Sequence, residues 1–484
     1  MRAFKCMAIV LAWIAGAGGA WAADPGRAWL DYHDQQSALP LRYEADGQAP
    51  FDGGTRRRFL LHSQHWPAGA PAEPAWSHRV EILTPDHPRP GPALLVINNG
   101  VHGGHGSFRQ QDADDMPPAL LEALSRELGM AVVSIADVPN QPLRLPGDDR
   151  YRSEDDLVAL SWRHFLDDPQ QKAHWPLHLP MALAAIRAMD LAGQELPPTL
   201  RPSFVVTGAS KRAWAAWLLP LVDERVSHLM PFVIGMHWQA LAPHIQRSYG
   251  QRWPIALYPY WQHGITARMG SPGFDALMKG SDPYSYLSGA LRDRLAVPKY
   301  LVDASGDDFF PPDSTQFYLA ELPGDTTLRV VPNSDHQGVR DYMLSSLLPA
   351  LRRWRSGRSL PEVDAEWSEE EGAMSVRITS NEAPVDMVLW GARNAHDREF
   401  RYACGIRYHA RPIPLSAGQQ WVVPLDAVQD GWGAAFIELR YADGFVATTP
   451  ARVYPRQRFP SHPPREGDGG CRLVPEQGGS AVGG

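Results

Sequence analysis

Three side chains that could together activate a nucleophile lie far apart along the chain. Ser210 stands in "FVVTGASKRA" (204–213), Asp307 in "SGDDFFPPDS" and His336 in "NSDHQG". A serine hydroxyl is a weak nucleophile until a histidine accepts its proton and a carboxylate orients that histidine. In α/β-hydrolases the three follow in the order serine, acid, histidine, each after a strand. The pattern therefore predicts a triad that cleaves an ester or an amide through an acyl-enzyme.

Each of these residues also has an ordinary structural interpretation. A serine between a strand and a helix is most often an N-cap, and an aspartate after a strand is most often a turn former. The G-x-S spacing recurs at 357–359 and 478–480, where nothing else indicates chemistry. All three residues in hydrolase order favour the triad. For the acid, Asp307 directly after Gly306 is preferred to Asp308.

An oxyanion hole needs two backbone N–H groups near the nucleophile. One would come from Lys211, and the other from Gly100 in the glycine-rich loop "NNGVHGGHGSF" after "ALLVI". Glycines let the backbone approach a ligand closely. His102 and His105 lie in the same loop, but without a neighbouring carboxylate cluster they are a weak metal signal. We predict no metal and no cofactor.

Substrate contacts are predicted directly after the nucleophile and in segment 238–298. The cations Lys211 and Arg212 would favour an anionic substrate group, and the equally good alternative is that they are solvated on the first helical turn. The aromatic residues of segment 238–298 would line the substrate cleft, with Trp238 and Trp261 in contact with the substrate.

The elements that must position these residues follow from the hydrophobic pattern. Short apolar runs alternate with helix-like stretches such as 117–129, which ends at Gly129, and 180–192, which precedes the serine strand. This alternation is typical of a parallel sheet covered on both faces, and it predicts an α/β protein with the α/β-hydrolase fold. The predicted strands are "RVEILTP" (79–85), "ALLVIN" (93–98), "AVVSIA" (131–136), "FVVTGA" (204–209), "LMPFVIG" (229–235), "KYLVDAS" (299–305) and "TLRVVP" (327–332).

The pattern also divides the chain into parts. Segment 238–298 is too long for a simple crossover, and we expect a mostly helical cap over the ligand-binding edge of the sheet. After about residue 360 the sequence alternates between apolar and polar residues, as in "AMSVRITS", which predicts a small antiparallel β domain of the sandwich type. The predicted parts are a signal peptide (1–22), an irregular N-terminal segment leading into a strand near "RRFLLHSQHW" (23–75), the hydrolase domain (76–358), the β domain (360–455) and a flexible tail (456–484).

The first residues read as a cleavable secretory signal, with Arg2 and Lys5 before a short apolar run. Export to the periplasm or the medium would leave Cys404 and Cys471 in an oxidising compartment, where we predict that they pair; two free thiols are the alternative. The formal charge of −8 becomes −10 without the signal, and with no basic stripe it argues against nucleic acid. No further apolar run is long enough to span a membrane. The oligomeric state is not readable from the sequence.

Several longer motifs carry a resemblance to a known family. They include "SQHW" (63–66), "VPNQPLRL" (138–145), "EDDLVALSW" (154–162), "VTGASKRAW" (206–214), "PKYLVDASGDDFF" (298–310) and "VPNSDH" (331–336). With these motifs the chain resembles the PhoPQ-activated pathogenicity-related family, secreted or periplasmic proteins similar to α/β-hydrolases. The resemblance implies a hydrolase domain followed by a β-rich domain, supports Asp307 as the acid and implies no substrate. It also implies an acid at the position where this chain has Gly235, in "VIGMH".

Two functions from different classes fit these observations. The first is a secreted serine hydrolase acting on a small ester or peptide. The second is a non-catalytic binding or signalling protein on a hydrolase scaffold, since a fold alone does not determine function. The retained serine, acid and histidine favour the hydrolase.

Overall fold

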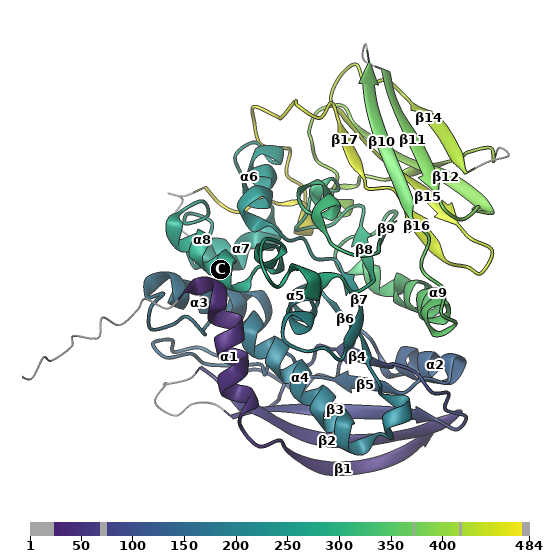
Figure 1. Ribbon diagram of the computed structural model, residues 1–484. Helices are drawn as coiled ribbons and strands as arrows, with labels where there is room; N and C mark the ends of the chain where they lie inside the picture. Colours follow the sequence, from purple (N-terminus) through teal and green to yellow (C-terminus); the bar gives the residue numbers. More distant parts are fainter. Residues whose placement is uncertain (1–23, 68–74, 371–372, 416–418, 477–484) are drawn as a thin grey trace, which may run out of the picture.

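A nine-stranded mixed sheet forms the centre of the protein (Figure 1). The computed structural model describes residues 24–67, 75–370, 373–415 and 419–476. The strand order is β1-β2-β3-β5-β4-β6-β7-β8-β9. The last six strands in this order, from β5 through β4 to β9, run parallel to one another. The strands are β1 Arg42–Phe51, β2 Gly54–His65, β3 Ala75–Pro85, β4 Ala93–Ile97, β5 Val132–Ile135, β6 Phe204–Ala209, β7 Val226–Phe232, β8 Lys299–Ala304 and β9 Thr326–Val331.

All seven predicted strands are present, but one prediction about their direction is wrong. The strand at 79–85 belongs to β3, which is antiparallel to both β2 and β5. A parallel neighbour needs a crossover connection, usually a helix. β1, β2 and β3 instead pair in sequence order as antiparallel neighbours, and no helix lies between them among the residues that the structure describes.

The N-terminal segment is more regular than predicted. It contains α1 (Ala28–Ser37), β1 and β2 rather than an irregular chain that leads into one strand. Strand β1 is exposed along most of its length and has no apolar alternation, so only its pairing with β2 reveals it. Helix α1 buries Trp29 and Tyr32, and the indole N–H of Trp29 donates to the carbonyl of Leu218 at 2.8 Å.

Helices cover both faces of the sheet because its strands are apolar on both sides. In β4, Leu94 and Val96 pack with α2 and α9, whereas Leu95 and Ile97 pack with α4 and α5. The predicted helices at 117–129 and 180–192 are confirmed as α2 and α4, and Gly129 ends α2 with φ of +60°. The helices are α2 Pro118–Leu128, α3 Glu154–Asp167, α4 His178–Glu195, α5 Lys211–Leu218, α6 Trp238–Ser248, α7 Tyr258–Gln262, α8 Pro272–Ser281 and α9 Met343–Arg355.

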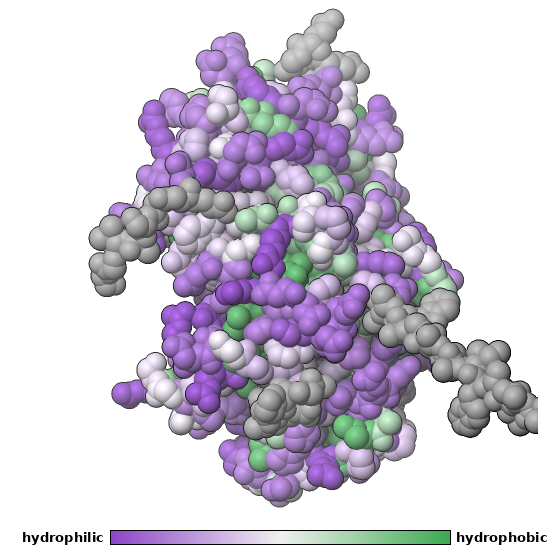
Figure 2. Space-filling view, turned by 90° about the vertical axis from the view of Figure 1, so that its left-hand side faces the viewer, coloured by the Kyte–Doolittle hydropathy of each residue, from purple (hydrophilic) through white to green (hydrophobic). Residues whose placement is uncertain are grey.

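The segment 238–298 is mostly helical, as predicted. It contains α6, α7 and α8 with short 3-10 turns between and after them. None of the helices within the described ranges is long and apolar enough to cross a membrane. Figure 2 views the side on which α6 and α8 lie, and hydrophilic side chains predominate there, with apolar ones in small groups.

Two antiparallel sheets follow α9, in agreement with the predicted change of pattern. One has the order β10-β11-β14, and the other β13-β12-β15-β16, with β17 paired to β15. Apolar side chains of both sheets, such as Val376 and Ile437, share one hydrophobic cluster. The strands are β10 Val363–Glu370, β11 Ala373–Ser380, β12 Asp386–Asn394, β13 His409–Pro412, β14 Gln420–Leu425, β15 Trp432–Arg440, β16 Val446–Thr448 and β17 Arg452–Tyr454.

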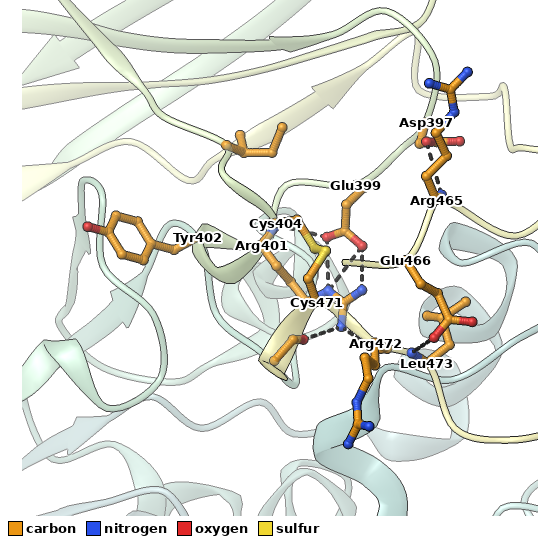
Figure 3. The surroundings of a disulfide bond; sticks show 12 residues. Asp397, Glu399, Arg401, Tyr402, Cys404, Arg465, Glu466, Cys471, Arg472 and Leu473 are labelled. Atoms are coloured by element: carbon orange, nitrogen blue, oxygen red, sulfur yellow. Dashed lines mark hydrogen bonds and ion pairs between the residues drawn. A yellow bond between two sulfur atoms is a disulfide. The ribbon is translucent and has the colours of Figure 1, made fainter. Parts of the chain in front are cut away.

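The predicted disulfide between Cys404 and Cys471 is confirmed (Figure 3). Arg401 stabilises the same junction, because its guanidinium donates to the carbonyls of Gly470 and Arg472 at 2.8 and 2.9 Å. The tail was expected to be mobile except near Cys471, but residues 456–476 pack onto α6 and the residues after it. Residues 477–484 and the predicted signal lie outside the described residues.

Candidate active site

Ser210 lies in a tight turn between β6 and α5. Its φ of +54° and ψ of −126° form a conformation that residues other than glycine rarely adopt. The turn is so close that a Cβ on Gly208 would lie 2.9 Å from the backbone of Arg212, which explains the glycine two residues before the serine. Ser210 is partly exposed at the carboxyl end of β6, and it forms no side-chain N-cap hydrogen bond. This is the geometry of a hydrolase nucleophile.

Asp307 and His336 come together from the ends of neighbouring strands. His336 Nδ1 donates to Asp307 Oδ2 at 2.8 Å, and the other carboxylate oxygen accepts the N–H groups of Phe309 and Phe310 at 2.7 and 3.1 Å. Both side chains are largely buried, with Asp307 3 % and His336 10 % exposed. Burial opposes the charge on the imidazole, but the Asp307 carboxylate outweighs it and raises the pKa of His336.

The second ring nitrogen of His336, Nε2, is free of hydrogen bonds to the described residues. Nε2 is buried and has no hydrogen-bond partner within the part of the chain that the structure describes. With Nδ1 donating to Asp307, the neutral ring carries its acceptor lone pair on Nε2. Phe309 packs against the ring at a centroid distance of 4.6 Å. No hydrogen bond joins Nε2 to the hydroxyl of Ser210 among the described residues, although a general base must have its acceptor nitrogen within reach of the proton that it takes.

Two further carboxyl groups lie near this pair. Asp308, the alternative acid of the sequence analysis, makes no hydrogen bond to His336, and its buried Oδ1 has no partner among the described residues. Burial and the charge of Asp307 raise the pKa of Asp308 to about 6. Burial also raises the pKa of Asp303, within β8, to about 7. The geometry therefore favours Asp307 as the partner of His336.

The two predicted oxyanion donors lie at the same sheet edge as Ser210. β4 and β6 are parallel neighbours with Ile97 opposite Gly208, so the loop containing Gly100 lies beside the serine turn. Gly100 has φ of +134°, and its N–H makes no hydrogen bond to any described residue. The N–H of Lys211 opens α5, where backbone donors have no partner within the helix. Neither N–H donates to an acceptor among the described residues.

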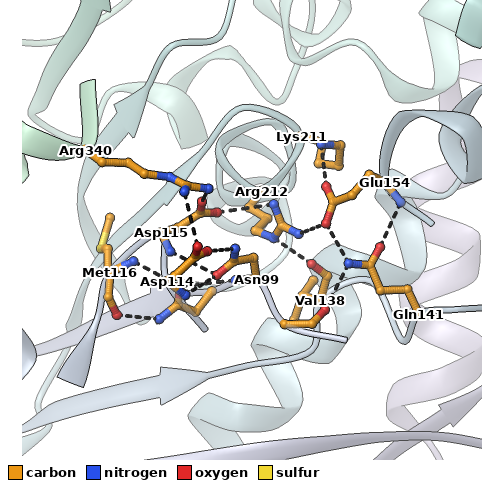
Figure 4. Close-up of polar contacts among 12 residues, drawn as sticks. Asn99, Asp114, Asp115, Met116, Val138, Gln141, Glu154, Lys211, Arg212 and Arg340 are labelled. Atoms are coloured by element: carbon orange, nitrogen blue, oxygen red, sulfur yellow. Dashed lines mark hydrogen bonds and ion pairs between the residues drawn. The ribbon is translucent and has the colours of Figure 1, made fainter. Parts of the chain in front are cut away.

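Lys211 and Arg212 are buried, contrary to the alternative that they are solvated. The ammonium of Lys211 binds Glu154 and Asp155 at 2.7 and 3.1 Å. The guanidinium of Arg212 donates to Glu154 at 2.6 Å, to the carbonyl of Val138 at 2.6 Å and to Asp115 at 3.3 Å (Figure 4). Its donors are directed at protein acceptors, so this geometry gives no support to Arg212 as a substrate contact.

The acidic partners of these cations were missed by sequence reasoning. Glu154 begins α3 with φ of +50°, and Arg212 and Lys211 hold its pKa well below the usual range although burial opposes this. Gln141 donates to both Glu154 and the carbonyl of Gly100, so it connects the loop of Gly100 to the partner of Lys211 and Arg212. The acidic residues at the start of "EDDLVALSW" stand in the sequence, but the sequence alone does not show that they pair with Lys211 and Arg212.

Asp115 extends the same network to the histidine loop. It binds Arg212 and also Arg340, which lies four residues after His336 (Figure 4). Asp115 is only 8 % exposed, so its charge is compensated by these two cations rather than by water. The loops around Ser210 and His336 are thus joined through one buried carboxylate.

The two tryptophans and the two loop histidines singled out in the sequence lie away from the Asp307–His336 pair or contact other protein groups. Trp238 and Trp261 line one cavity of about 520 Å³, although Ser210 and His336 are not part of its lining. His102 Nε2 lies 3.0 Å from both the carbonyl of Ser77 and Oδ1 of Asn140, and His105 packs against a tyrosine ring. Within the described ranges, no group of three or more histidine, cysteine, aspartate or glutamate residues could hold a metal.

The mixed sheet with helices on both faces, and the serine turn at the carboxyl end of its parallel strands, define an α/β protein with a hydrolase-like scaffold. The chain belongs to the PhoPQ-activated pathogenicity-related protein family, which matches residues 30–401. Autocrine proliferation repressor protein A of Dictyostelium discoideum is 29 % identical over 405 residues, which are 79 % of each chain.

Solved structures with a similar fold include several esterases. The acetyl xylan esterase of Paenibacillus sp. R4 is 16 % identical with a TM-score of 0.47, covering 69 % of this chain and 95 % of its own. That of Thermoanaerobacterium sp. JW/SL YS485 is 14 % identical with a TM-score of 0.42, covering 65 % and 88 %. The glucuronoyl esterase of Solibacter usitatus is 14 % identical with a TM-score of 0.39, covering 66 % and 89 %.

Proposed function

We propose that the protein is an exported serine hydrolase that cleaves an ester or amide bond. The observation that carries this proposal is the buried Asp307–His336 pair, whose free Nε2 lies at the sheet edge that also carries Ser210. The retention of all three groups in hydrolase order adds to it. In this reading the chain has the α/β-hydrolase fold, segment 238–298 is its cap, and the C-terminal sheets form a sandwich-like domain.

The proposed reaction begins with attack of Ser210 Oγ on the substrate carbonyl carbon. His336 Nε2 takes the hydroxyl proton, and Asp307 stabilises the resulting imidazolium through Nδ1. The N–H groups of Lys211 and Gly100 would bind the oxyanion of the tetrahedral intermediate. His336 then gives its proton to the leaving alcohol or amine as the acyl-enzyme forms. A water molecule, deprotonated by the same nitrogen, releases the acid and restores Ser210.

The substrate is proposed to be a small ester or a short peptide. The contacts predicted from sequence, Trp238 and Trp261, line a cavity that does not include Ser210 or His336, so we assign them no part in the reaction. Nucleic acid is disfavoured by the acidic net charge. The disulfide supports export to the periplasm or the medium, because such bonds persist in oxidising compartments.

One observation favours a second candidate function. The similar protein of Dictyostelium discoideum is named as a repressor of proliferation, and this name describes no enzyme. A binding or signalling protein on the same scaffold would keep the fold without using the triad. Reactivity of Ser210 distinguishes the two functions.

The test is covalent labelling with a fluorophosphonate probe. Folded wild-type protein should be labelled, and Ser210→Ala and His336→Ala should not be. Ser359→Ala is the matched control, because Ser359 is in another G-x-S sequence and its replacement should leave labelling unchanged. Circular dichroism would establish that each variant is folded. Absence of labelling in the wild type would favour the binding protein, and labelling that survives Ser210→Ala would refute the site.

A further inference from the structure

The cavity beside α6 has a composition that the proposed reaction does not explain. It encloses about 520 Å³, within the roughly 300–1,000 Å³ typical of small-molecule sites. Its walls come from α6, from the residues that follow α6 up to Gly270, and from Val474 to Glu476 of the tail. Residues more than 200 positions apart in the sequence therefore build one site.

Three tryptophans form the apolar part of the wall. Trp238 and Trp253 are buried, with 4 % and 9 % of their surface exposed, and Trp261 is partly exposed. Trp238 is fixed in place, because it stacks on Trp214 at 6.3 Å and meets the edge of Phe310 at 6.0 Å. Its indole N–H has no acceptor among the described residues. Trp261 is therefore the tryptophan with surface open to the cavity, and Trp238 and Trp253 contribute only small exposed areas.

Three glutamines add polar groups that the protein itself does not use. The side chains of Gln239, Gln246 and Gln251 line the cavity, and none of them hydrogen bonds to another described residue. Each amide offers both a carbonyl acceptor and N–H donors. Gln251 has φ of +68°, a strained conformation of the kind that clusters at ligand-binding positions.

The cavity has no uncompensated charge. Arg252 and Glu476 are the only charged residues among the described ones that line it, and they form an ion pair with each other at 2.8 Å. A charged ligand would therefore find no counter-charge. A purely apolar ligand would leave the amides without partners, which is unfavourable. The lining fits a neutral ligand with one apolar face and several groups that both donate and accept hydrogen bonds.

We propose that this cavity binds a neutral saccharide. The C–H groups on one face of a pyranose ring fit a tryptophan surface, and its hydroxyls match the dual capacity of the glutamine amides. Binding does not depend on the proposed hydrolase activity, since Ser210 and His336 lie outside the lining. Trp238 separates the saccharide from Phe310, which packs beside His336.

The test is a titration of the mature chain with manno-, cello- and chito-tetraose. Binding is measured by tryptophan fluorescence and by isothermal titration calorimetry. At least one sugar should bind saturably at one site. Trp261→Ala and Gln246→Ala should each weaken that binding, Trp261→Ala by about tenfold or more. Trp367→Ala is the matched control, because Trp367 is a partly exposed tryptophan of β10 outside the cavity, and it should bind as the wild type does. Ser210→Ala should also bind normally.

Two results of the sugar titrations would overturn the proposal. One is that none of the three sugars binds to folded protein at millimolar concentration. The other is that binding is unchanged in both Trp261→Ala and Gln246→Ala, or is weakened equally in Trp367→Ala. An acetylated and amidated tetrapeptide rich in tyrosine and proline serves as a competing ligand class. Preferential binding of this peptide to the cavity would assign the site to peptides and would also contradict the proposal. Because Ser210→Ala is included, loss of hydrolysis and loss of sugar binding are separately visible.

Discussion

His336 Nδ1 lies 2.8 Å from Asp307 Oδ2, while the neighbouring carboxyl of Asp308 makes no hydrogen bond to the ring. We therefore expect Asp307→Asn to lower the rate of fluorophosphonate labelling, and any hydrolysis of p-nitrophenyl acetate, by a factor on the order of 10³–10⁴. The amide can no longer hold the imidazole in the required tautomer. Asp308→Asn is the matched control and should change the rate less than about tenfold. Equal losses in the two variants would contradict the assignment of the acid.

The pH dependence of the reaction follows from the same pair. Asp307 raises the pKa of His336 above its ordinary value of 6.5, and the base must be neutral to act. We expect kcat/KM to rise with pH and to reach half its maximum above pH 6.5. In Asp307→Asn the midpoint should move to lower pH, because burial and Lys211 then dominate. A midpoint that moves upward would show that Asp307 is not the group that sets this pKa.

The same raised pKa has a consequence for stability. A group whose pKa is higher in the folded state contributes stability below its unfolded pKa, and this contribution is lost as the pH rises through the folded value. The difference in thermal stability between wild type and Asp307→Asn should therefore be larger at pH 6 than at pH 9. Differential scanning calorimetry at the two pH values measures it, and an equal difference at both would contradict the ion pair.

Arg212 is expected to contribute to folding rather than to substrate binding. Its guanidinium is buried and binds Glu154, Asp115 and the carbonyl of Val138. Arg212→Met should destabilise the protein by about 3–5 kcal/mol, because Asp115 would stay buried with less compensation. Chemical unfolding measures this, with exposed Arg27→Met as the control. A stable Arg212→Met variant with a raised KM only for anionic esters would instead support the substrate contact predicted from sequence.

The position of Ser210 could be predicted from the sequence, whereas the surroundings of Arg212 could not. The strands before Ser210, Asp307 and His336 are uniformly apolar, so their positions and the meeting of their carboxyl ends follow from the pattern. The partners of Arg212 could not be predicted from the sequence pattern. They are 58 and 97 residues away, and a charged residue in a sequence does not indicate which opposite charge it will pair with. Strand β1 was missed for a related reason, since it is polar and exists through pairing.

Loss of the disulfide should loosen the loop that carries Asp307. Tyr402 N donates to the carbonyl of Gly306 at 3.0 Å, and the bond from Cys404 to Cys471 closes a 67-residue separation in the same region. The double variant Cys404→Ser/Cys471→Ser should lose about 4 kcal/mol, as expected for a loop of this length, and should label more slowly. Thermal unfolding and labelling measure the two effects. Reductant should reproduce them in wild type and have no effect on the double variant; wild type unaffected by complete reduction would contradict this role.

Gly235 is the position at which the family resemblance implies an acid. Neighbouring side chains leave no room there for a larger residue. A Cβ there would lie 2.9 Å from Leu241 Cδ2 and 3.1 Å from the ring of Phe310, which packs beside His336. Gly235→Asp should therefore destabilise the protein by about 1–3 kcal/mol through overpacking, and it should lower labelling because Phe310 is displaced. Gly391→Asp is the matched control, since a Cβ at Gly391 meets nothing within 4 Å. Chemical unfolding of the two variants measures the difference. If Gly235→Asp is as stable as Gly391→Asp and labels normally, the space beside Phe310 can accept the acid, and its loss has no structural cause in this chain.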